Sequence, residues 1–112
     1  METGLTFTSK AVVKKENTAI TMGSGDMEVF ATPAMVALME NAAMKAVAAE
    51  LSEGATTVGA MMNTSHIKPS PLGAEVSATA VLTEVDGRKL TFSVKASDEA
   101  GVVGEGTHIR YI

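Results

Sequence analysis

The sequence predicts an α+β fold in which one long central helix is wrapped by a curved antiparallel β-sheet. The first observation is a helical segment at residues 33–51, which is rich in Ala, Met and Leu. The second is that strand-like segments follow it one after another, with no further long helix among them. One buried helix against one antiparallel sheet is a stable two-layer solution for such an order of elements.

The boundaries of the helix are marked in the sequence. Thr32 is the predicted N-cap, and Pro33 stands at the first helical position, where its missing N–H costs nothing. Gly54 supplies the left-handed stop. Up to Ala43 almost every side of this helix is apolar, so we expect it to be enclosed by other elements.

The predicted strands are short segments rich in Val, Thr and Ile, separated by turn residues. The dipeptide Asp86-Gly87 is the strongest hairpin signal in the chain, and residues 69–73 form a second turn. Residues 16–28 are polar and are expected to form a loop around Gly23 to Asp26. The predicted strands are 5–13, 56–68, 74–85, 89–96 and 102–112.

Composition limits the classes of function. A chain of 112 residues with 46% hydrophobic and 20% charged residues predicts one globular domain, 1–112. A subunit partner would help such a small core. The net charge of −4 and the pI near 5.1 argue against nucleic acid and anionic membranes as partners. The lack of Cys, of an apolar leader and of any membrane span predicts a cytoplasmic protein.

Glu40 is the first candidate for chemistry. Its helical neighbours three and four positions away, Val36, Ala37, Ala43 and Met44, are apolar and offer it no cation. A carboxylate on an apolar face is costly unless it is paired or hydrogen-bonded, which favours a general base or nucleophile. The alternatives are that this side faces solvent, or that a cation from a distant strand pairs with Glu40.

His66 lies late in the predicted strand 56–68. Simple alternation places it on one face with Val58, Ala60, Met62 and Thr64, and this mainly apolar face should look toward the helix. An imidazole there could move protons or hold a carboxylate, although a lone His is more often a satisfied core residue.

The other histidine, His108, shares a face with Gly104, Gly106 and Arg110 by the same alternation. The spacing of His66 and His108 and the lack of a carboxylate cluster predict no metal site.

Thr32 and Gly59 each allow two interpretations. The Thr32 hydroxyl has a sufficient role as a helix cap, but it could also orient water or substrate at the helix N-terminus. Gly59 weakens its strand unless a group must approach the backbone closely, and its N–H could bind the oxyanion that forms at a carbonyl under attack. The alternative for Gly59 is a bulge in a curved sheet.

Several motifs together resemble the fluoroacetyl-CoA thioesterase-like proteins, over residues 29–112 and in the same order and spacing. The motifs are Val29-Phe30-Ala31-Thr32-Pro33 leading to Glu40, Val58-Gly59, His66 followed by Pro69, Pro71 and Gly73, and the closing run from Gly104 to Arg110.

The resemblance implies a hotdog fold, a homodimer, and hydrolysis of acyl-CoA thioesters without a metal or bound cofactor. It also implies catalytic roles for Thr32, Glu40 and His66, an oxyanion position at Gly59 and a polar position near the site at Arg110. The fluoroacetyl-specific member is similar in having aromatic residues in the loop before the helix. Residues 22–27 contain none here, which argues for a different acyl group.

Helical geometry constrains the site. Eight residues separate Thr32 from Glu40, which is roughly 12 Å along the axis and about 80° around it, so the two side chains cannot share one hydrogen bond. We therefore expect each site to draw on two subunits. The competing interpretations are an acyl-thioester hydratase or dehydratase on the same fold and a non-catalytic acyl-CoA binding module.

Overall fold

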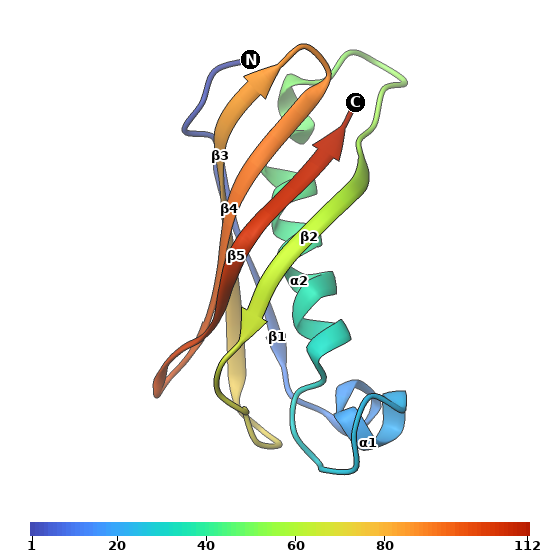
Figure 1. Cartoon of the computed structure of the whole chain (residues 1–112), viewed down its shortest axis with the longest axis vertical. Helices are drawn as coiled ribbons and strands as arrows, with labels where there is room; N and C mark the ends of the chain where they lie inside the picture. Colours follow the sequence, from blue (N-terminus) through green and yellow to red (C-terminus); the bar gives the residue numbers. More distant parts are fainter.

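The computed structural model describes the whole chain, residues 1–112. One long helix packs against one face of a five-stranded sheet (Figure 1), which confirms the predicted α+β class and order of elements. The elements are β1 (Thr6–Val12), η1 (Lys15–Asn17), α1 (Ala19–Met22), α2 (Thr32–Val47), η2 (Ala48–Glu50), β2 (Val58–His66), β3 (Glu75–Asp86), β4 (Lys89–Asp98) and β5 (Gly101–Tyr111). The short helices η1 and α1 overlap residues 16–28, so the prediction of a plain loop there is wrong for its first part.

The sheet is antiparallel throughout, with the strand order β1-β3-β4-β5-β2. The predicted hairpin joins β3 to β4, and Gly87 supplies the left-handed conformation of its turn with φ of 60°. β1 and β2 form the two edges. β2 is therefore held by β5 alone, so the first strand after the helix lies beside the last strand of the chain.

The start of α2 differs from the prediction. Ala31, not Thr32, is the N-cap, and its carbonyl accepts the first helical hydrogen bond from Met35 N–H at 3.0 Å. Thr32 is the first helical residue, and no side chain caps this end. The α-helix also ends earlier than expected, at Val47, and one 3₁₀ turn continues it to Glu50.

Most of the core lies between α2 and the strands β3 and β4. The helix buries residues at three- and four-residue spacing, which form one apolar stripe. Alternate residues of β3 and β4 face this stripe. The buried helix residues are Met35, Met39, Ala42, Ala43 and Val47, and the strand residues are Val76, Ala78, Ala80, Leu82, Leu90, Phe92, Val94 and Ala96.

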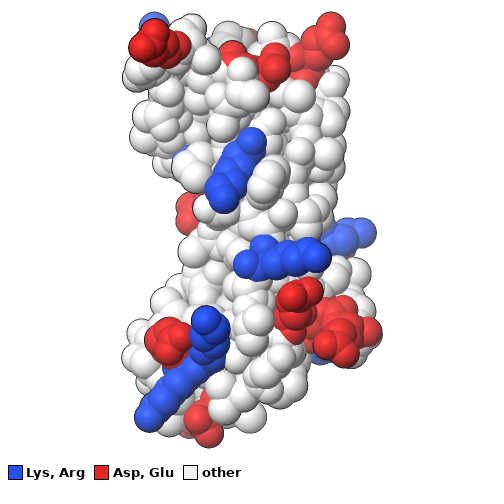
Figure 2. All heavy atoms as spheres, turned by 180° about the vertical axis from the view of Figure 1, so that it is seen from behind, with Lys and Arg blue, Asp and Glu red and all other residues white.

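The opposite side of α2 is not covered within one chain. Ala37 and Met44 are exposed there, so the expectation that the sheet encloses the whole helix is wrong for a single chain. The view from behind shows a face dominated by uncharged atoms, with most acidic side chains toward its two ends (Figure 2). None of the helices has the length and apolar character needed to cross a bilayer.

A β-bulge in β2 changes which side chains face the helix. The register with β5 shifts between Gly59 and Met61, because Ala60 is an extra residue there. Gly59 pairs with Arg110, whereas Val58 points outward and is 61% exposed. The prediction that Val58 shares a face with His66 is therefore wrong, and Gly59 takes its place.

A buried carboxylate ties the turn after β2 to the end of β4. Asp98 accepts hydrogen bonds from Lys68 Nζ at 2.8 Å, from Ser70 Oγ at 2.7 Å and from Ala100 N–H at 2.8 Å. These bonds, led by the one from Lys68, lower the pKa of Asp98 below its usual 3.8. Ser70 O in turn accepts a hydrogen bond from Phe30 N–H at 2.9 Å. The turn therefore fixes the backbone just before α2.

Candidate functional site

Thr32 and His66 meet where the first turn of α2 approaches the end of β2. Thr32 Oγ1 lies 2.7 Å from His66 Nδ1, a hydrogen-bonding distance. Thr32 is already the first helical residue, and its hydroxyl is directed at His66 rather than at the backbone N–H groups of the first turn. The structure thus brings together two of the three residues expected to be catalytic.

The second nitrogen of His66, Nε2, is buried and has no hydrogen-bond partner. Burial lowers the pKa of His66 below its ordinary 6.5, so the ring is neutral at physiological pH. Beside it lies a cleft of about 250 Å³, which Thr32, His66, Phe30 and Lys68 help to line. An unpartnered imidazole nitrogen at a cleft can exchange a proton with a bound molecule.

Glu40, Gly59, His108 and Arg110 form a second group. A Cβ built on Gly59 would lie 3.3 Å from Glu40 Oε2, 3.4 Å from His108 Cε1 and 3.5 Å from Arg110 Nη1. Three side chains therefore converge on the one position of β2 that has no side chain. Glu40 is half-buried, and it forms no ion pair with Arg110.

His108 and Arg110 are buried beneath Glu40, with exposures of 0% and 7%. Arg110 Nε donates to Thr57 Oγ1 at 2.8 Å and Nη2 donates to Thr57 O at 3.0 Å. Burial is the main cause that lowers the pKa values of both His108 and Arg110, and the Glu40 carboxylate opposes it in each case. The carboxylate and the guanidinium thus interact electrostatically without direct contact.

The two groups occupy separate clefts within one chain. The Thr32–His66 pair lines the first cleft, whereas Glu40, Gly59 and Arg110 line a second one of about 430 Å³. The expectation that His66 holds Glu40 is therefore not met within a chain, where His66 contacts Thr32. The separation of Thr32 from Glu40 agrees with the helical geometry predicted from the sequence.

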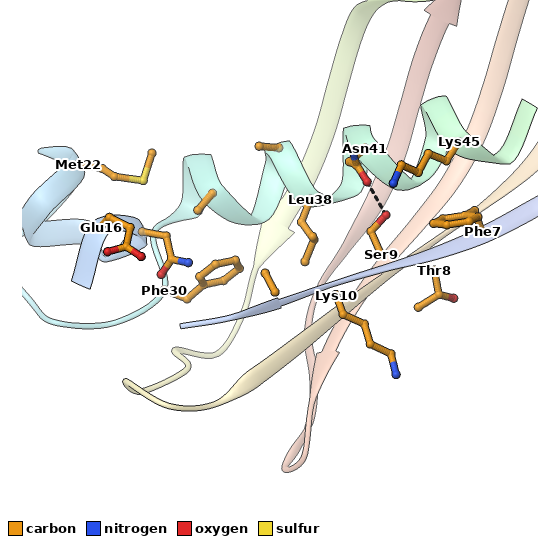
Figure 3. Close-up of a pocket in the computed structure, with 14 residues that line it drawn as sticks. Phe7, Thr8, Ser9, Lys10, Glu16, Met22, Phe30, Leu38, Asn41 and Lys45 are labelled. Atoms are coloured by element: carbon orange, nitrogen blue, oxygen red, sulfur yellow. Dashed lines mark hydrogen bonds between the residues drawn. The ribbon is translucent and has the colours of Figure 1, made fainter. Parts of the chain in front are cut away.

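A larger groove of about 820 Å³ lies between β1 and α2 (Figure 3). It shares Ala37 and Asn41 with the Glu40 cleft and Phe30 with the Thr32–His66 cleft. Ser9 Oγ donates to Asn41 Oδ1 at 2.7 Å across it. Lys45 Nζ lies 5.5 Å from the centre of the Phe7 ring, a cation–π contact at its rim. None of the predicted site residues lines this groove.

Sequence reasoning assigned no role to His108 or Thr57, although both hold Arg110. The alternation of His108 with Arg110 on one strand was a usable signal, since two polar side chains on an inward face need partners. Thr57 precedes the first residue of β2 and carried no such signal.

Residues 13–112 match the family of fluoroacetyl-CoA-specific thioesterases. The chain belongs to this family. A fluoroacetyl-CoA thioesterase of Streptantibioticus cattleyicolor is 41% identical over 85 residues, which are 76% of this chain and 61% of that relative. The match thus spans less than two thirds of the relative's length.

Solved structures agree with this family assignment. A mutant of the fluoroacetyl-CoA-specific thioesterase, crystallised with fluoroacetate and CoA, has a TM-score of 0.92 and 36% identity, covering 99% of this chain and 94% of that one. A thioesterase superfamily member from Thermus thermophilus has a TM-score of 0.89 and 27% identity, covering 98% and 82%. A hot-dog-like protein from Thermanaerovibrio acidaminovorans has the same TM-score and identity, covering 99% and 82%. The predicted hotdog fold is confirmed.

Proposed function

We propose that this chain is an acyl-CoA thioesterase that hydrolyses a small acyl-CoA thioester to a free acid and CoA. Its membership of the fluoroacetyl-CoA-specific thioesterase family supports the reaction type. The observation that carries the proposal is the half-buried Glu40 carboxylate, which faces Gly59 beside Arg110 without pairing with it. A thioester carbonyl placed there would have a base or nucleophile on one side and hydrogen-bond donors on the other.

In the proposed mechanism, Glu40 removes a proton from water as its oxygen attacks the carbonyl carbon, or attacks that carbon itself. The negative charge on the carbonyl oxygen is stabilised by Gly59 N–H and by Arg110. The carbon–sulfur bond then breaks, and the departing thiolate takes up the proton that Glu40 removed from water, passed on through His66, which Thr32 orients. In the direct route, water then hydrolyses the anhydride formed with Glu40 and supplies that proton. Label found in Glu40 after a single turnover in ¹⁸O-water would identify direct attack, because the general-base route never exchanges the carboxylate oxygens.

We propose that a homodimer completes the site. β2 is an edge strand whose free backbone groups can pair with another strand, and one face of α2 is uncovered. A two-fold dimer can bring the Thr32–His66 pair of one copy to Glu40 of the other. Activity should then disappear when the protein is diluted to the monomer, with the oligomeric state measured by light scattering in the same buffer. An active monomer would contradict the shared site.

The acyl group is proposed to differ from fluoroacetyl, because the loop before α2 lacks aromatic residues over 22–27. Met22 at the end of α1 and Met27 in the loop after it are exposed, and flexible thioether side chains adapt to varied shapes. A panel of short, branched and aryl acyl-CoAs, with fluoroacetyl-CoA and an enoyl-CoA included, identifies the substrate by release of free thiol. Consumption of the enoyl-CoA without thiol release would instead favour a hydratase.

Glu40→Gln tests the site directly, and Glu50→Gln is its matched control on the exposed turn that continues the same helix. Removal of a general base should lower kcat by about 100-fold or more, since such groups contribute about 10²–10⁴-fold. Glu50→Gln should leave the rate unchanged. Thiol release that survives Glu40→Gln would remove the basis of the proposal, and acyl-CoA binding without turnover in the parent protein would favour a binding module.

A further inference from the structure

His108 is a fully buried histidine that the proposed mechanism does not use. Both of its ring nitrogens have partners: Nδ1 lies 2.8 Å from Met61 O, and Nε2 lies 3.2 Å from Arg110 Nη1. A carbonyl only accepts hydrogen bonds and a guanidinium only donates them. Nδ1 must therefore carry the hydrogen, and Nε2 must be an acceptor.

Only the neutral ring with this one tautomer satisfies both contacts, because an imidazolium has no acceptor for Arg110. The ring is also fixed from the side, since Phe92 of β4 packs near it with ring centres 6.3 Å apart. His108 is thus held in a single orientation with its lone pair directed at the guanidinium.

The contacts of Arg110 show what this orientation achieves. Its Nε and Nη2 donate to Thr57, and its Nη1 donates to His108, so three of the five N–H groups of the guanidinium are committed. Glu40 approaches the same point of β2, yet no ion pair forms. Arg and carboxylate groups that meet frequently form a bidentate ion pair. Here the hydrogen bonds to Thr57 and His108 hold the guanidinium instead.

We propose that His108 is a positioning residue that holds Arg110 away from Glu40, which keeps the carboxylate free to act on a thioester. This inference rests on the proposed function and extends it. The two remaining N–H groups of Arg110 stay available to the acyl carbonyl. Without the Nε2 acceptor, the guanidinium swings onto Glu40, and the ion pair occupies the base and the donor together.

Two substitutions separate the roles of the ring nitrogens. In His108→Gln, the side-chain oxygen replaces Nε2 as the acceptor for Arg110, and the contact to Met61 O is lost. In His108→Asn, the amide replaces the Nδ1 donor to Met61 O, and the acceptor for Arg110 is lost. If His108 acts through Arg110, His108→Gln keeps kcat within about 5-fold of the parent, whereas His108→Asn lowers it by about 10- to 100-fold, the range for a hydrogen bond to a charged group. KM changes little in both.

A double-mutant cycle with Arg110→Met gives the decisive comparison. Once Arg110 is absent, His108→Asn should have no further effect on kcat, because no guanidinium remains to capture Glu40. A purely structural role predicts that the two losses multiply, and that both His108 variants lose activity in proportion to their fall in melting temperature. Either result would overturn the proposal.

The tautomer is measured separately on the parent protein by ¹⁵N NMR of the imidazole at neutral pH, which requires neither activity nor a variant that folds. A protonated Nδ1 with a bare Nε2 is expected, and a protonated Nε2 would refute the inference. If no acyl-CoA is hydrolysed, the proposed function fails whatever the NMR result. If hydrolysis occurs and the cycle is additive, only the role of His108 fails.

Discussion

Replacing Gly106 with Ala should destabilise this protein more than any comparable change on β5. A Cβ at Gly106 would lie 2.1 Å from Asn63 O and 2.6 Å from Thr64 Cα, both backbone atoms of β2. Ordinary contact begins at 3.4 Å, so the two strands must separate by more than 1 Å. Glycine is needed here for space, because Gly106 does not have a positive φ.

The magnitude follows from what this separation breaks. Hydrogen bonds between β2 and β5 lengthen beyond their working range, and each contributes about 1 kcal/mol. Overpacking a close contact costs about 1–3 kcal/mol in addition. β2 has no partner strand on its other side within the chain, so little besides the Thr32–His66 hydrogen bond to α2 holds it when β5 moves away. We expect a loss of about 3 kcal/mol, which lowers the melting temperature by about 10–15 °C in a domain of this size.

Thermal unfolding followed by circular dichroism measures the effect. The control is Glu105→Ala, the neighbouring exposed residue on the outward face, which should remain within about 0.5 kcal/mol of the parent. Below its melting temperature, Gly106→Ala should also lose thioesterase activity, because β2 carries both Gly59 and His66. A melting temperature within 3 °C (about 0.6 kcal/mol) of the parent would refute the reasoning from close approach.

Three further predictions follow from the ionisable and polar groups. Burial lowers the pKa values of His66 and His108, so the unfolded chain takes up protons at a higher pH than the folded chain does. The free energy of unfolding, measured by urea titration, should therefore be constant above about pH 7 and decline as the pH falls below about 6.5. A free energy of unfolding that increases as the pH is lowered from 7 to 5 would contradict this. Asp98→Asn should cost about 2 kcal/mol in the same assay, with the exposed Asp86→Asn unchanged. Thr32→Val should lower kcat by about 10- to 100-fold without a change in melting temperature, whereas Thr32→Ser should retain most of the rate; equal rates for the two would exclude a role for the hydroxyl.

Local signals in the sequence predicted the elements well. The Ala- and Met-rich segment became α2, and Asp86-Gly87 became the β3–β4 turn, because both depend on short-range backbone preferences. The prediction of Thr32 as the N-cap was wrong, and its side chain instead takes part in a long-range contact. Its hydroxyl has a partner, His66, that lies 34 residues away, and local propensity contains no information about such a contact.

The bulge in β2 is the other feature that the sequence could not reveal. Strand periodicity assumes strict alternation, and one extra residue reverses every assignment on one side of it. For this reason Val58 was expected inside and lies outside, while Gly59 faces the helix. The prediction for His66 survived because the bulge at Ala60 comes before it.

This bulge and the candidate base depend on one another. Met61, the first residue after the bulge, offers its carbonyl to His108 Nδ1, so the histidine that holds Arg110 also holds the bulge in place. The bulge in turn directs Gly59 inward, where the lack of a side chain leaves room for Glu40. The helix offers Glu40 no cation of its own, and the two groups whose pKa values the carboxylate raises, His108 and Arg110, both lie on β5. Glu40 can therefore remain a free carboxylate only while the bulge, His108 and Arg110 keep their present register.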